Sequence, residues 1–257
     1  MGRNLRLQYE GALYHVRSRG NGQQDIFLDD RDRQLFLKIL GKVIQECAWI
    51  CHSYCLMNNH YHLLVGTPRA NLARGMLELN GSYAKVFNLR HSRTGHVLGG
   101  RYGAKLIEDD TYLLVVARYI ALNPVGAFLI DDPSEWKWSS YNAYCGTSRD
   151  EDFLTTEFLL SYFGSRELPP AQAFSRYVIE GIEASRSSNK KPPLSKILPV
   201  GAQRRDREKA ICIAFLEYDY SQREIAAYLG VHHTTVGRII RRQVENAPLV
   251  PGTIGAF

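Results

Sequence analysis

Residues 51–65 read CHSYCLMNNHYHLLV, an apolar run that contains two histidines separated by one residue. Successive side chains of a strand alternate between its two faces, so His60 and His62 project to the same face. The asparagine pair at 58–59 interrupts the apolar run and favours a tight turn. This stretch therefore predicts two antiparallel strands, the second of which carries two imidazoles side by side.

Two imidazoles held on a rigid strand can chelate one divalent metal ion. The same spacing also suits a pair of hydrogen-bonded histidines on a half-buried sheet. The spacing of His60 and His62 leaves both interpretations open.

A second element, RYIALNPV at residues 118–125, follows a segment with helical periodicity. Acidic residues suit the N-terminal end of a helix over 109–122, and its apolar residues recur at helical spacing. Pro124 predicts that the helix ends at about Asn123. Tyr119 and Asn123 are four residues apart, which places them one turn apart on one face.

A phenol is an adequate nucleophile towards phosphorus once a metal polarises the phosphate. Tyr119 therefore suits covalent attack on a phosphodiester. The alternatives are that Tyr119 is a packing residue and that Asn123 before proline only stops the helix.

Further short blocks occur in order between Tyr14 and Tyr144. They are YHV at 14–16, RGN at 19–21, LMNNHYH at 56–62, GSY at 81–83, GRY at 100–102, YI at 119–120, NPV at 123–125 and WSSY at 138–141. With these blocks the chain resembles the single-tyrosine HUH transposases, in particular the REP-associated tyrosine transposase group. The family often has Arg-Ala after Pro-Val, where this chain has Gly-Ala at 126–127.

The resemblance implies a role for four residues. His60 and His62 would bind the metal, Asn123 would be the third ligand, and Tyr119 would be the nucleophile. Imidazoles alone would also suit zinc, so the expectation of Mg2+ or Mn2+ rests on the resemblance. The family also implies a homodimer that cuts single-stranded DNA at hairpins or repeats.

Composition agrees with a globular protein. The chain has 257 residues, of which 45% are hydrophobic and 23% charged, and no apolar run approaches the roughly 20 residues that span a bilayer. The N-terminus lacks the apolar core of a signal peptide, so we expect a cytoplasmic protein without a membrane partner. A net charge of +6 and a pI near 9.0 favour an anionic partner such as nucleic acid.

Three of the five cysteines lie at residues 47, 51 and 55. An odd count does not favour a disulfide framework. A zinc site there, with His52, is a weaker alternative because the spacing does not match the usual ligand pairs.

Strands and helices alternate through the first part of the chain. Strands are expected at 12–18, 49–56, 60–65 and 102–108, and helices at 30–45, 72–87 and 109–122. This order predicts an α+β fold, a ferredoxin-like antiparallel sheet with helices on one face. The other face would be free for the histidines and for DNA.

The chain divides by composition into four parts. Residues 1–145 would form the catalytic domain, 146–184 a helical extension that braces it, and 185–203 a linker that is polar, basic and broken by prolines. Residues 204–245 would form a small all-α helix-turn-helix domain.

The sequence of residues 221–242 carries the helix-turn-helix signal. The stretch SQRE at 221–224 is a capping box, Gly230 suits a sharp turn, and HTTV at 233–236 resembles the DNA-binding end of the bacterial replication initiator. The expected packed residues are Ile225, Ala226, Leu229, Val231, Val236 and Ile239. The expected duplex-DNA contacts are His233, Thr234, Thr235, Arg238, Arg241 and Arg242. A helical bundle for protein contacts is the alternative.

Together these features predict metal-dependent cleavage and strand transfer of single-stranded DNA through a 5'-phosphotyrosine. Arg17, Arg19, Arg101 and Lys105 are candidates for guiding the strand. Two alternatives remain: a DNA-binding regulator whose transposase domain only dimerises, and a nuclease that uses water and leaves no covalent adduct.

Overall fold

The computed structural model describes residues 8–148, 151–164, 168–187, 193–198, 204–216, 220 and 222–245. The chain forms two compact units, one up to Ile182 and one from Glu183. Within the described residues, every helix is too short or too polar to cross a membrane.

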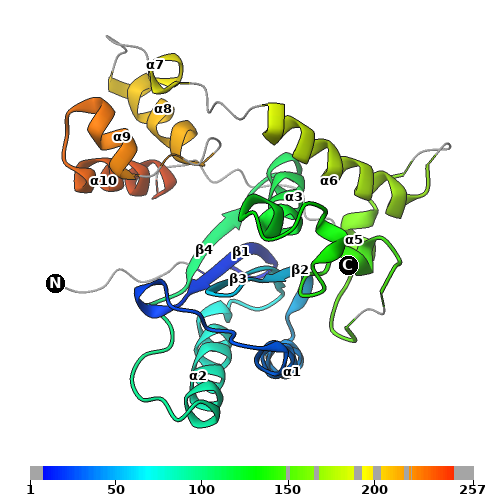
Figure 1. The fold of residues 1–257 in the computed structure, drawn as a ribbon. Coiled ribbons are helices and arrows are strands. Elements are labelled where there is room, and N and C mark those ends of the chain that lie inside the picture. The colour runs from blue at the N-terminus through cyan, green and yellow to red at the C-terminus, as the bar shows by residue number, and fades with distance from the viewer. Residues whose placement is uncertain are drawn as a thin grey trace. The chain divides into compact units, whose positions relative to one another are not determined.

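The first unit is built on a four-stranded antiparallel sheet (Figure 1). Its strands are β1 (Ala12–Arg19), β2 (Ile50–Leu56), β3 (His60–Thr67) and β4 (Gly103–Ile107). The spatial order is β2-β3-β1-β4, and each neighbouring pair runs antiparallel. The predicted α+β fold with a ferredoxin-like sheet is confirmed.

The helices differ from the prediction because they cover both faces of the sheet (Figure 1). One face carries α1 (Asp30–Cys47) and α2 (Leu72–Arg90). The other carries α3 (Asp110–Gly126), α4 (Tyr141–Tyr144), α5 (Glu157–Leu160) and α6 (Pro170–Ser187). The second face needs cover because the side chains of Cys55 on β2 and Leu64 on β3 are apolar and fully buried there.

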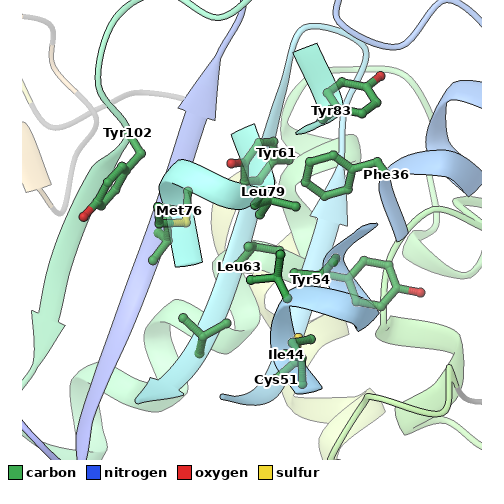
Figure 2. Packing of buried hydrophobic residues seen from close by; sticks show 14 of the residues in the cluster. Phe36, Ile44, Cys51, Tyr54, Tyr61, Leu63, Met76, Leu79, Tyr83 and Tyr102 are labelled. Carbon is green, nitrogen blue, oxygen red and sulfur yellow. The ribbon is translucent and has the colours of Figure 1, made fainter. Parts of the chain in front are cut away.

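The first core lies between the sheet and helices α1 and α2 (Figure 2). Aromatic rings from three elements meet there: the ring of Phe36 lies 4.6 Å from that of Tyr61 and 5.2 Å from that of Tyr83. Tyr61 is the residue between the two histidines, so its burial in this core turns His60 and His62 to the opposite face.

A β-bulge in β2 separates the neighbouring cysteines. The register of β2 against β3 shifts between Cys51 and Ser53, so the strict alternation of faces is broken there. Cys51 lies in the first core and Cys55 in the second. These two thiols therefore lie on opposite faces of the sheet and cannot share one zinc ion.

Helix α3 begins as predicted but does not end at Pro124. The Asp109 carboxylate accepts a hydrogen bond from the Tyr112 amide at 2.7 Å and caps the helix. The helix then continues through Pro124 to Gly126. A proline in the last turn removes only one amide donor, and the turn is closed by the Ala127 amide, which donates to the Asn123 carbonyl at 3.0 Å.

Two short 3-10 helices, η1 (Asn21–Gln23) and η2 (Pro133–Glu135), lie in the connections. After η2 the chain returns to the outer edge of β2. The Leu56 amide donates to the Trp138 carbonyl at 2.9 Å, and the Ser140 amide donates to the Tyr54 carbonyl at 3.0 Å. These bonds occupy backbone groups that a free sheet edge would expose.

The second unit contains α7 (Leu194–Ile197), α8 (Arg204–Leu216), α9 (Gln222–Leu229) and α10 (His233–Glu245). Its core includes Ile225, Ala226, Val236 and Ile240. The prediction that Val231 is packed was wrong: it directly follows the turn at Gly230 and is 40% exposed. Ile239 is only partly buried, since Ile240 takes the inward position of α10.

Part of the predicted linker is helical. Residues 193–198 contain α7, and Leu198 is buried in the core of the second unit. Residues 185–187, also predicted as linker, are the last residues of α6. The remaining linker residues, 188–192 and 199–203, lie outside the described residues, as does Ser221 of the capping box.

Because His52 is buried, we expect the stability of the folded protein to fall at acidic pH, independently of any activity. Its side chain is 6% exposed with its ring 4.6 Å from that of Phe158, and burial lowers its pKa to about 4. The unfolded chain binds the proton at about pH 6.5, so stability falls as the pH drops from there towards 4. We expect the free energy of unfolding, measured with urea at pH 7 and 4.5, to fall by on the order of 3 kcal/mol more in the wild type than in His52→Gln. An equal fall in both proteins would contradict this assignment.

Candidate active site

The two histidines of β3 lie opposite two arginines of β1. In the antiparallel register Arg19 pairs with His60 and Arg17 pairs with His62. Paired residues of adjacent strands project to the same face of a sheet. The strands therefore place two imidazoles and two guanidinium groups together on the face that is covered in part by α3.

Helix α3 carries Tyr119 and Asn123 to the same place. The Oδ1 atom of Asn123 lies 3.1 Å from Nε2 of His60. The Tyr119 ring lies edge-on to that of His62, with 5.3 Å between ring centroids. Tyr119 is 44% exposed, so its phenol is accessible from outside the protein. The structure thus brings together all four residues for which the sequence predicts roles in catalysis.

His60 lies between two amide oxygens. Its Nδ1 is 2.7 Å from Oδ1 of Asn59, and its Nε2 is 3.1 Å from Oδ1 of Asn123. A neutral imidazole has only one N–H, so it can donate to only one of these oxygens. If the proton is on Nδ1, the lone pair of Nε2 faces the lone pairs of Asn123, an arrangement that a cation between them would stabilise.

His62 is almost fully buried, with 2% of its surface exposed. Its Nδ1 lies 2.9 Å from Nε2 of His15 on β1. Its other ring nitrogen, Nε2, is buried and has no hydrogen-bond partner in the part of the chain that the structure describes. An unsatisfied buried polar atom is costly and requires an explanation, such as a ligand that binds there.

Burial keeps these imidazoles neutral at pH 7. It lowers the pKa of His60, lowers that of His62 well below its usual value, and lowers that of His15 to about 4. The positive charges of Arg17 and Lys105 lower the pKa of His15 further. Neutral imidazoles are the form in which histidine binds metal ions.

The donor set fits one divalent ion. Nε2 of His62, which has no hydrogen-bond partner among the described residues, Nε2 of His60 and the facing Oδ1 of Asn123 could offer such an ion two nitrogen donors and one oxygen donor. Among the described residues no three His, Cys, Asp or Glu side chains are grouped to hold a metal. An amide would therefore have to be the third protein ligand of any ion bound here, and three protein ligands would leave positions open for a substrate oxygen.

Three of the four predicted strand-guiding residues flank the histidines. Arg17 and Arg19 are exposed on β1. Lys105 of β4 pairs with His15, and its Nζ lies 3.8 Å from the ring centroid of Tyr112. Arg101 precedes β4 and is exposed, and no contact links it to the histidines.

Gly103 on β4 makes room for the side chain of Arg17. A Cβ atom at Gly103 would lie 3.1 Å from Cγ and 3.2 Å from Nε of Arg17. The arginine therefore lies across the sheet over the glycine, where a larger residue would displace it.

The predicted duplex contacts lie on α10 in the second unit. His233, Thr234 and Arg238 are exposed, and Thr235 is partly buried. The side chains of Arg241 and Arg242 lie outside the described residues.

The sequence analysis missed two residues of this site, His15 and Asn59. Each contacts the Nδ1 atom of a histidine through its side chain. The signal for His15 was its place on a predicted strand at even spacing from Arg17 and Arg19, which puts all three on one face. Asn59 was assigned only to the turn.

Part of the chain matches a known protein family. Residues 8–123 match the family described as Transposase IS200 like, a region that contains His15, the two histidines, Tyr119 and Asn123. A search of curated proteins finds no match.

Two solved structures are similar to the chain. One is a REP-associated tyrosine transposase bound to a REP hairpin, with a TM-score of 0.50 and 15% identity over 60% of this chain and 94% of that one. The other is a candidate transposase from Deinococcus radiodurans R1, with a TM-score of 0.33 and 17% identity over 45% of this chain and 91% of that one. The first likeness establishes the transposase fold of the first unit.

Proposed function

We propose that this chain is a metal-dependent tyrosine transposase that cleaves and rejoins single-stranded DNA. One observation carries the proposal: the ring of Tyr119, which is 44% exposed, lies edge-on to that of His62, on the same face of the sheet as His60 and its partner Asn123. The match of residues 8–123 to the IS200-like transposase family supports it.

Tyr119 would attack the phosphorus in line. A bond forms between its phenolic oxygen and the phosphorus while the phenolic proton passes to water. The bond to the 3'-oxygen breaks, and that oxygen takes up a proton from water. The products are a 5'-phosphotyrosine and a strand that ends in a 3'-hydroxyl. Because the phosphodiester energy is kept in the covalent link, a second 3'-hydroxyl can reverse the step without ATP.

His60, His62 and Asn123 would hold Mg2+ or Mn2+, which when bound polarises the scissile phosphate. The other positive charges near the phosphates would come from arginine side chains of the protein. Arg17 and Arg19 pair with the two histidines across β1 and β3, so both are placed to bind phosphates beside the scissile one.

We propose a DNA hairpin or repeat as the substrate. A solved structure with a similar fold is bound to a REP hairpin, and the net charge of +6 suits an anionic partner. We also propose that the protein acts as a homodimer.

A cleavage assay with metal removal tests the proposed function. Hairpin DNA with single-stranded flanks should be cut in Mn2+, and EDTA should stop cleavage because the phosphate then lacks its cation. Asn123→Ala should be milder than loss of a histidine, since water can replace one neutral oxygen ligand. Cleavage that persists in EDTA would exclude the metal, and binding without any cleavage would favour a regulator.

We propose that the second unit binds duplex DNA through α10. Arg241→Ala and Arg242→Ala should each weaken binding to all sequences and lower the salt slope by about one. Thr235→Ala should change sequence preference instead. Lys42→Ala, which removes a charge from a 65% exposed side chain on α1, is the matched control. If the α10 variants bind duplex DNA no differently from the control, the unit has another role, such as protein contacts.

A further inference from the structure

The ring of His15, on β1, contacts the rings of both His62 and Tyr119. Its ring stacks on that of His62 at 5.1 Å between centroids and lies edge-on to that of Tyr119 at 5.9 Å. Its only hydrogen-bond contact among the described residues joins its Nε2 to Nδ1 of His62 at 2.9 Å. This bond lies on the side of His62 away from the unpartnered Nε2 atom.

A cation on Nε2 of His62 would determine which of the two rings donates in this hydrogen bond. A ring nitrogen that binds a cation must present its lone pair, so the single proton of a neutral His62 must then lie on Nδ1. That N–H can donate only to the lone pair of Nε2 of His15. His15 must in turn carry its own proton on Nδ1.

We infer that His15 is a positioning residue that holds His62 as the Nδ1–H tautomer, with Nε2 directed to the divalent ion. The inference rests on the proposed function, since it deepens the account of the same site. Asn59 is placed to do the same for His60, because its Oδ1 lies 2.7 Å from Nδ1 of that ring. Each histidine of the pair therefore has a hydrogen-bond acceptor beside Nδ1, the ring nitrogen that would not bind the ion.

A metal ligand is oriented in this way when its second nitrogen donates to a fixed acceptor, and loss of such an acceptor costs about 10- to 100-fold in metal affinity. His15 differs from the usual carboxylate or carbonyl acceptor because it is neutral. His15 can accept this hydrogen bond only when its own proton is on Nδ1, so the tautomers of His15 and His62 depend on each other.

Two substitutions distinguish the role of His15 as a hydrogen-bond acceptor from the packing of its ring. His15→Phe keeps an aromatic ring against His62 and Tyr119 but has no nitrogen. His15→Gln places an amide oxygen near the former position of Nε2 and restores an acceptor. We would measure Mn2+ affinity by titration calorimetry, and the His62 tautomer by 15N NMR of the metal-free proteins.

We expect Mn2+ binding to weaken about 10- to 100-fold in His15→Phe and to return to within a few-fold of the wild type in His15→Gln. In the wild type His62 should be protonated on Nδ1, and His15→Phe should lose this preference. Equal Mn2+ affinity in all three proteins, or a wild-type His62 protonated on Nε2, would overturn the inference and leave the proposed function standing. Absence of saturable Mn2+ binding in the wild type would overturn the proposed metal site and this inference with it. The wild-type NMR result decides the matter even if His15→Phe fails to fold.

Discussion

His62→Ala is expected to lower DNA cleavage by at least about 100-fold while hairpin binding changes little. The substitution removes the buried Nε2 atom that has no hydrogen-bond partner among the described residues and that we propose as a ligand of the divalent ion. In the proposed mechanism the ion acts mainly on charge that develops at the scissile phosphate, whereas Arg17 and Arg19 would bind DNA in the ground state. Loss of the ligand should therefore affect the rate of cleavage far more than the affinity. His60→Ala should behave in the same way.

The measurement is single-turnover cleavage in Mn2+ beside hairpin binding by fluorescence anisotropy. His52→Gln is the matched control, because His52 is also a buried strand histidine but lies against Phe158 rather than near Tyr119. It should cleave as the wild type does. Cleavage retained in His62→Ala, with the protein folded by circular dichroism, would mean that this histidine has only a packing role.

Tyr119→Phe should abolish the covalent protein–DNA adduct and lower cleavage by on the order of 10⁴-fold or more, as loss of a nucleophile does. The substitution removes one oxygen and leaves the ring, which packs edge-on to His62. Stability should change little because Tyr119 is 44% exposed. The adduct would be detected as labelled DNA that stays with the protein on a denaturing gel.

Tyr112→Phe is the control for this experiment. Tyr112 lies seven residues earlier on the same helix, and Lys105 contacts its ring with Nζ 3.8 Å from the centroid. We expect the Tyr112→Phe protein to form the covalent protein–DNA adduct at the wild-type rate. Adduct formation that is lost in Tyr112→Phe and kept in Tyr119→Phe would reverse the assignment.

The sequence predicted the parts of the site that depend on local periodicity. Alternation in β3 put His60 and His62 on one face, and the spacing of four in α3 put Tyr119 beside Asn123. Both features hold in the structure because the buried neighbours, Tyr61 among them, fix the orientation of each element.

The parts that depend on tertiary packing were not predicted. Helix α3 covers the histidine-bearing face because Leu64 is buried there, a position that alternation alone does not distinguish from an exposed one. The contact between His15 and His62 requires β1 to lie next to β3 in a particular register, which neither strand's own sequence specifies. Pro124 stays within the helix because it stands in the last turn, where the cost of its missing donor is small.

Peptide mapping of the covalent DNA adduct tests the central claim most directly. Trypsin cleaves after Lys105, Arg118 and Lys137, so residues 106–118 contain Tyr112 as their only tyrosine and residues 119–137 contain only Tyr119. After nuclease trimming of the DNA, mass spectrometry should find the added nucleotide on the peptide of residues 119–137. A nucleotide on any other peptide, or cleavage of the hairpin without a covalent adduct, would contradict the assignment of Tyr119 as the nucleophile.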